Sequence, residues 1–241
     1  MRGQKMALPQ LVRTDSLSNQ LFGILKEAIF AGKFQPGEAL RELTLARTMG
    51  VSQATVREAL TQLEQAGLVV RSQTRRTTVT SFTQDEVRDR LAMRIVLEEL
   101  AFEKAARAMT EDDFQTLDGL SNDIDDLARV GDSLHMTLAD MRFHRFIWER
   151  AGSPVMLRTL DQLTTPLFAF LSVLHGQGMH DLRSGRSHRD LVAALHSGQE
   201  ETIRAAIRGH IGGSYRKFLE SGTPSLDMLI QRPQALADLQ R

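Results

Sequence analysis

The segment MGVSQATVREALTQLEQAGLVV, residues 49–70, decides the fold of the first part of the chain. Gly50 ends the short helical pattern ELTLARTMG, and small polar side chains and one arginine follow it. Apolar residues then recur at helical spacing behind these polar groups: Val56, Ala59, Leu60 and Leu63. Two short helices that meet at a glycine turn predict a helix-turn-helix, whose second helix lies in the major groove of DNA.

The start of this second helix carries the polar side chains that a recognition helix needs. We expect Ser52 to cap the helix and to contact a phosphate, because a serine hydroxyl serves in both ways. Gln53 and Thr55 are expected to read base edges, and Arg57 to bind a phosphate or a guanine. An ordinary helical corner has the same glycine and leucines, so the motif by itself leaves that alternative open.

The residues on both sides of this segment complete a small domain. Upstream, residues 17–29 carry apolar residues at helical spacing, and Gly32 and the Pro36-Gly37 turn end this helix. Downstream, residues 68–80 predict two strands joined by the basic tip RSQTRR. Such a β-hairpin is the wing of a winged helix-turn-helix, and it favours DNA binding over the helical corner.

The remainder of the chain is predicted to be helical. Thr83 with Glu86 and Thr110 with Asp113 match the capping-box pattern, and strand patterns disappear after residue 82. Helical patterns cover residues 84–108, a segment starting at Thr110, and residues 133–151, 155–175 (with Pro166 bending it), 186–197 and 199–220.

The predicted fold class is therefore mainly α, with an N-terminal winged helix-turn-helix followed by an all-α helical bundle of about six helices. The expected organisation is a flexible N-terminal arm at 1–12, a DNA-binding domain at 13–81, a helical ligand-binding and dimerisation domain at 82–221, and a C-terminal tail at 222–241.

Composition excludes several classes of protein. The 241 residues suffice for two domains with buried cores, and the apolar fraction of 41% argues against disorder. Because the chain has no cysteine, it has no disulfide, no thiolate metal site and no cysteine nucleophile. The N-terminus lacks the apolar core of a signal peptide, and no run approaches the ~20 apolar residues of a membrane helix. We therefore expect a cytoplasmic protein with no membrane partner.

The net charge of zero hides an asymmetry between the two parts. Residues 1–81 contain 11 Lys and Arg against 6 Asp and Glu, whereas residues 82–241 contain 19 against 24. A basic first part suits a polyanion as its partner, although a difference of this size also arises by chance.

Four residues of the second part form a candidate metal site. Asp140 and His144 are four residues apart, so they share one helix face and can bind one cation together. His188 opens a helix with an apolar face, and His210 follows an apolar stripe that points it inward. Spacing alone leaves open whether these histidines bind a metal or are hydrogen-bonded in a core.

The first part resembles the GntR family of bacterial transcription regulators. AIFAGKFQPGEAL, LARTMGVSQATVREALTQLEQAGLV and the wing carry the resemblance, which covers residues 17–80 almost continuously. The family usually has arginine where Gln53 stands, often proline or threonine at Thr55, and a wing glycine where Arg76 stands. The departure at Gln53 implies an altered operator preference. Without the wing glycine, Arg75 and Arg76 are expected to enter the minor groove as side chains.

The second part resembles the FCD-type effector domain of the FadR subgroup, which is an all-helical bundle. In that type, an Asp-x3-His pair and two later histidines surround a metal ion. The resemblance implies that this ion is bound by Asp140, His144, His188 and His210. Zinc, nickel and manganese all suit such ligands, and open coordination positions remain for a small carboxylate.

The segment MRIVLEELAFEKAA matches the first helix of that domain type. Arg94 and Glu98 stand at the family's arginine and glutamate positions, so Arg94 is expected to bind a ligand carboxylate through a charge-assisted fork. The alternative is a solvated arginine that pairs with Glu98 one turn away.

Together these features predict a ligand-responsive transcription regulator, a homodimer on a palindromic double-stranded operator, and no enzyme. A metal-dependent hydrolase or lyase that uses the same four ligands is the alternative from another class. A third interpretation keeps the regulator but gives the metal a purely structural role.

Overall fold

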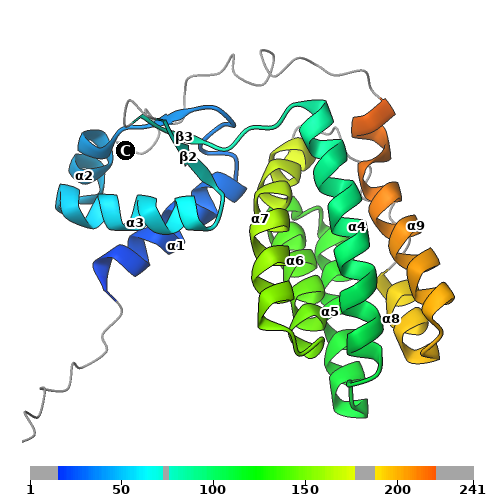
Figure 1. Cartoon of the computed structure of the whole chain (residues 1–241). Helices are drawn as coiled ribbons and strands as arrows, with labels where there is room; N and C mark the ends of the chain where they lie inside the picture. Colours follow the sequence, from blue (N-terminus) through cyan, green and yellow to red (C-terminus); the bar gives the residue numbers. More distant parts are fainter. Residues whose placement is uncertain (1–15, 73–75, 177–187, 221–241) are drawn as a thin grey trace, which may run out of the picture.

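The computed structural model describes residues 16–72, 76–176 and 188–220 of the chain. These residues form two parts that lie side by side: the head, residues 16–81, and the bundle, residues 82–220 (Figure 1). The predicted fold class is confirmed, because a small winged helical head precedes an all-helical bundle. The predicted arm at 1–12, the predicted tail at 222–241 and Arg75 lie outside the described residues.

The head consists of three helices and a small antiparallel sheet. The helices are α1 (Leu17–Phe30), α2 (Glu42–Met49) and α3 (Gln53–Gln65), and the strands are β1 (Ala39–Leu40), β2 (Val69–Arg71) and β3 (Thr77–Val79), in the order β1-β3-β2. The predicted hairpin is formed by β2 and β3, with Val69 opposite Val79. Strand β1 is an addition to the prediction, because two residues are too few to show an alternating pattern.

Helix α3 begins and packs as its sequence predicts. The Ser52 hydroxyl accepts a hydrogen bond from the Thr55 backbone amide at 3.1 Å, and Gly50 turns the chain with a φ of 64°. The apolar face of α3 is buried in the core of the head through Val56, Ala59, Leu60 and Leu63.

Six helices form the bundle in the described part of the chain. They are α4 (Gln84–Ala106), α5 (Glu111–Val130), α6 (Ser133–Arg150), α7 (Pro154–Gly176), α8 (His188–Ser197) and α9 (Glu200–Glu220). Both predicted capping boxes are present, at Thr83 with Glu86 and at Thr110 with Asp113. None of these helices or of those in the head combines the length and the apolar character that a membrane crossing requires.

The head contacts the bundle through α7. Apolar residues of the two parts line one seam: Ile29, Phe34, Leu68 and Val79 from the head, and Pro166, Ala169, Phe170 and Val173 from α7. Phe82, the first residue of the bundle, meets Phe170 edge-on with ring centroids 5.9 Å apart. The Arg90 guanidinium lies 4.5 Å from the centre of the Phe82 ring and donates to the Leu163 carbonyl. The seam therefore holds a small head against the bundle.

Replacing Gly67 by alanine is expected to destabilise this seam. Gly67 has a φ of 72°, and a Cβ atom placed there would lie 2.9 Å from Pro166 Cγ, in a rigid ring. The left-handed conformation costs about 1–2 kcal/mol in a residue with a Cβ, and overpacking adds about 1–3 kcal/mol. Gly50→Ala is the matched control, because its φ is 64° but no atom lies within 4 Å of its added Cβ. Urea unfolding measures the free energy of unfolding of both variants. Equal losses of this free energy would contradict the close contact of Gly67 with Pro166 at the seam.

Candidate DNA-binding surface and metal centre

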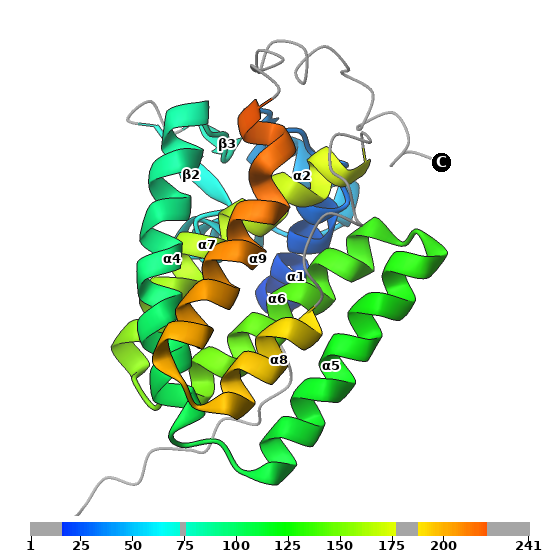
Figure 2. The same cartoon turned by 90° about the vertical axis from the view of Figure 1, so that its right-hand side faces the viewer.

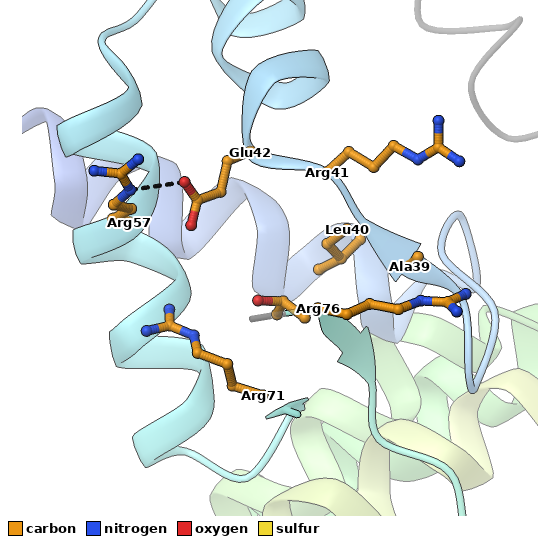
Figure 3. Close-up of a pocket in the computed structure, with 8 residues that line it drawn as sticks. Ala39, Leu40, Arg41, Glu42, Arg57, Arg71 and Arg76 are labelled. Carbon is orange, nitrogen blue, oxygen red and sulfur yellow. Dashed lines mark hydrogen bonds and ion pairs between the residues drawn. The ribbon is translucent and has the colours of Figure 1, made fainter. Parts of the chain in front are cut away.

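Four arginines gather on one surface of the head (Figure 3). They come from the residue that precedes α2, from α3, from the end of β2 and from the residue that precedes β3. The four arginines are Arg41, Arg57, Arg71 and Arg76. Together with Ala39, Leu40, Glu42 and Thr77 they line a concavity of about 880 Å³. Such a concentration of guanidinium groups beside the start of a recognition helix suits the phosphates of a DNA duplex.

An ion pair orients Arg57. Its Nε atom lies 2.7 Å from Glu42 Oε2, while 62% of the Arg57 side chain stays exposed (Figure 3). Glu42 stands in the first turn of α2, so the contact joins the two helices of the motif. The pair fixes the direction of Arg57 through Nε and leaves the outer edge of the guanidinium toward solvent.

The other predicted contact residues lie around the start of α3 and in the wing. Ser52 and Gln53 are exposed, while Thr55 is half-buried and its hydroxyl lies 2.9 Å from Ser52 Oγ. Arg76 is exposed beside β3. The capping role of Ser52 is confirmed, and the DNA contacts of these residues stay predictions.

Two arginines of the concavity were missed by the sequence reasoning. Arg41 is the residue before α2, and Arg71 is the last residue of β2. Arg71 is the first residue of the basic tip RSQTRR, but the sequence pattern does not show that Arg71 or Arg41 lies beside the recognition helix. Their place beside Arg57 and Arg76 extends the candidate surface from α3 to the sheet.

Arg57→Ala is expected to weaken operator binding by about 1–3 kcal/mol, roughly 5- to 150-fold in Kd. The loss follows from removing one oriented guanidinium from a base or a phosphate. Arg129→Ala is the control, because Arg129 is exposed on α5 and pairs with its helix neighbour Asp126. Fluorescence anisotropy at one fixed salt concentration measures both variants, since phosphate contacts depend on salt. Equal affinity of Arg57→Ala and wild type would remove Arg57 from the surface.

The four predicted metal ligands lie together in the bundle. One ligand atom from each residue lies within 4.8 Å of the others, for Asp140, His144, His188 and His210. His188 Nε2 is 2.8 Å from Asp140 Oδ1, and His144 Nε2 is 3.2 Å from His210 Nε2. Helices α6, α8 and α9 therefore meet at this cluster, which we call the His/Asp cluster.

Glu98 and Arg94 of α4 support the His/Asp cluster from behind. Glu98 Oε2 lies 2.7 Å from His144 Nδ1, so the Nε2 atom of that ring faces the cluster. Arg94 Nε donates to Glu98 Oε1 at 2.5 Å, and its guanidinium lies 4.8 Å from the centre of the Phe168 ring. The side chains of Arg94 and Glu98 are 3% and 0% exposed. The pairing of Arg94 with Glu98 considered from the sequence is therefore present, but the pair is buried and not solvated.

Burial and close charges shift the pKa values of this network. Burial alone raises the pKa of Glu98, but Arg94 and His144 outweigh it and lower that pKa to about 2. Burial likewise opposes the ionisation of Asp140, whose pKa is held well below its usual value by hydrogen bonds from His144 and His188. Burial lowers the pKa of His144, but the Glu98 carboxylate more than reverses this and raises it.

The last histidine of the cluster behaves differently. Burial lowers the pKa of His210 well below its usual value, and the neighbouring His188 and His144 lower it further. His210 is therefore neutral, and one nitrogen of its ring is unprotonated. By contrast, His135 and His196 are more than half exposed and lie outside the cluster.

The donor set fits a divalent metal ion. Three imidazoles and one carboxylate supply the nitrogen and oxygen ligands that zinc, nickel and manganese accept. The contact between His144 Nε2 and His210 Nε2 holds one proton at most, whereas a cation between the donors uses both lone pairs. Glu98 holds the ring of His144 as a carboxylate behind a metal-bound histidine does.

Two family patterns together account for most of the chain. The FCD domain matches residues 89–213, and the family "Bacterial regulatory proteins, gntR family" matches residues 17–79. The uncharacterised HTH-type transcriptional regulator YdhC of Bacillus subtilis is 27% identical over 79% of this chain and 86% of its own length. A probable D-xylose utilization operon transcriptional repressor of Paenarthrobacter nicotinovorans is 26% identical over 84% and 88%. The HTH-type transcriptional repressor RspR of Escherichia coli is 24% identical over 84% and 89%.

Solved structures agree on the fold. E. coli McbR/YncC superposes with a TM-score of 0.70 at 23% identity, over 82% of this chain and 94% of that one. A GntR transcriptional regulator of Rhodococcus sp. RHA1 gives a TM-score of 0.55 at 21% identity, over 92% and 97%. Both families and all these relatives are transcription regulators. The comparisons therefore support the transcription regulator and not the alternative of a hydrolase or lyase. The chain belongs to the GntR family of bacterial transcription regulators and carries an FCD domain behind its DNA-binding head.

Proposed function

We propose that this regulator is a repressor whose bundle holds one divalent metal ion and responds to a small carboxylate. The observation that carries the proposal is the convergence of four ligand atoms within 4.8 Å, at a point where three helices meet. Asp140, His144, His188 and His210 would hold the ion, and Glu98 would fix the ring of His144. Zinc, nickel and manganese are the candidate metals.

A bound metal ion supplies a Lewis-acidic centre with coordination positions that four protein ligands leave open. A small carboxylate suits such positions, because its oxygens are hard, charged donors. Arg94 adds a buried positive charge next to the ligand His144, through their shared partner Glu98. The carboxylate of the effector would therefore bind the metal, and the buried charge of Arg94 would attract it from behind the cluster.

Repression is supported by the names of two relatives, and the palindromic operator by the two-fold symmetry of a homodimer. Two relatives carry the word repressor in their names. One head presents one recognition helix, and a homodimer places two of them on half-sites that are related by a two-fold axis. Because the partner is double-stranded DNA, we place the protein in the cytoplasm.

Selection of DNA from a random pool by the full-length protein, loaded in turn with zinc, nickel or manganese, tests this function. We expect a palindromic sequence to emerge, and at least one acid from a panel containing acetate, lactate and citrate to change its Kd by about 5- to 150-fold. The response should disappear after the metal has been removed with EDTA. Absence of any selected sequence would contradict the proposed operator binding, and an acid response that survives metal removal would assign the metal a purely structural role.

A further inference from the structure

The outer face of α4 carries apolar side chains that no other described element covers. Met93, Val96 and Leu100 are 49%, 57% and 48% exposed, and half-buried Leu97 lies beside them. The other sides of α4 pack against α6, α7, α8 and α9. Figure 1 shows α4 in front of the bundle, with α7 and α9 on its two sides. We call this outer face the α4 stripe.

The α4 stripe has charged residues at both ends and apolar residues in the middle. Asp89 stands one helical turn before Met93, and Lys104 one turn after Leu100. Within the described part of the chain, neither Asp89 nor Lys104 forms an ion pair. The stripe therefore runs from a negative end through an apolar centre to a positive end.

When a second copy of the α4 stripe lies antiparallel to the first, the order of charged and apolar residues on the two copies is complementary. If two copies of α4 lie antiparallel about an axis between Val96 and Leu97, Met93 of one copy faces Leu100 of the other. The same axis brings Asp89 of each copy to Lys104 of the other. Such self-complementarity about a two-fold axis is what an isologous interface between identical subunits requires.

We infer that the α4 stripe is the surface through which a second copy of this chain binds. The inference rests on the homodimer of the proposed function and adds its location, its antiparallel arrangement and its register. Contact would remove the exposed apolar side chains from water at the centre and pair opposite charges at the rim, as in other stable interfaces. It would also place the α4 helices, which lead directly from the two heads, against each other.

A single introduced cysteine tests the register, because the natural chain has none. Val96 lies beside the two-fold axis, so Val96→Cys is expected to give a covalent dimer with a mild oxidant or a short thiol cross-linker. Val130→Cys is the control, because Val130 is 76% exposed at the end of α5, and Figure 2 shows α5 and α4 on opposite sides of the bundle. Cross-linking of Val130→Cys but not of Val96→Cys would overturn the inference.

Exchange of charges tests the pairing at the rim. Asp89→Lys places like charges opposite each other at two symmetric positions and is expected to raise the Kd of dimerisation by about tenfold or more. Adding Lys104→Asp to the same chain restores opposite charges, and the double variant is expected to recover the wild-type Kd. Asp126→Lys on α5 makes the same change of net charge away from the stripe and should leave the Kd unchanged.

Light scattering of the full-length wild type separates failure of the inference from failure of the proposed homodimer. A dimer in which Val96→Cys does not cross-link, or in which the charge exchange does not rescue, overturns the α4 surface and keeps the homodimer. A wild-type protein that stays monomeric, both free and on DNA, overturns both. A wild-type dimer with a cross-linked Val96→Cys and a rescued double variant is the result that we expect.

Discussion

Glu98→Ala is expected to lower the free energy of unfolding by about 3–5 kcal/mol, because it removes one partner of a buried ion pair. Arg94 is only 3% exposed, and Glu98 Oε1 accepts a hydrogen bond from its Nε at 2.5 Å. Without the carboxylate, the guanidinium would stay buried but would lose the opposite charge that Glu98 supplies. The same change also removes the group that orients the ring of His144.

Asp126→Ala is the matched control for this variant. Asp126 pairs with Arg129 in α5, but both side chains are about 70% exposed, so water takes over the role of the lost partner. Its cost should stay below about 1 kcal/mol. Urea unfolding of the metal-free proteins measures both variants without any contribution from a bound ion. Similar losses for Glu98→Ala and Asp126→Ala would show that the buried pair contributes no more than a surface pair.

The second large effect concerns the metal. A ligand that binds only the folded state stabilises it by about 4 kcal/mol at roughly 1,000 times its Kd, and the His/Asp cluster exists only when α6, α8 and α9 are packed together. We therefore expect saturating zinc, nickel or manganese to raise the Tm of the wild-type bundle by several degrees. The rise should be lost in His210→Ala, which lacks one of four ligands.

The relevant quantity is the difference in Tm with and without metal, determined separately for each variant. His210 is 4% exposed, so its removal leaves a cavity that lowers the Tm whether or not metal is present. Taking the difference cancels that cost. His196→Ala is the control, because His196 lies on the exposed side of α8 and outside the cluster. An equal metal-induced rise in His210→Ala and in wild type would contradict the ligand assignment.

The recognition helix and its wing were predictable because their signals are local. A glycine at a helix end, a serine at the next helix start and apolar residues at helical spacing each act within a few residues, as Gly50, Ser52 and Leu60 illustrate. The capping boxes at Thr83 and Thr110 are equally local. The sequence pattern also placed Asp140 and His144 on one helix face, since helical geometry fixes that spacing.

Features that depend on tertiary contacts were not predictable in this way. The burial of Arg94 depends on α7, which supplies Phe168. The sequence of α4 alone does not indicate that Arg94 is buried. The place of Arg41 and Arg71 beside Arg57 depends on how α2 and β2 pack against α3. Likewise, the seam at Gly67 and Pro166 joins residues that are far apart in the sequence. The family resemblance, rather than spacing, selected His188 and His210 as partners of the helix pair.

Metal content tests the central claim most directly, because the proposed response depends on one ion in the His/Asp cluster. Full-length wild type, His210→Ala and His196→Ala are purified, equilibrated with zinc, nickel or manganese, freed of excess metal and analysed by inductively coupled plasma mass spectrometry. We expect about one tightly held ion of at least one metal per chain in wild type and in His196→Ala, because their four ligands are intact. His210→Ala is expected to hold far less of that metal. Full occupancy in His210→Ala, or no bound metal in wild type, would contradict the account.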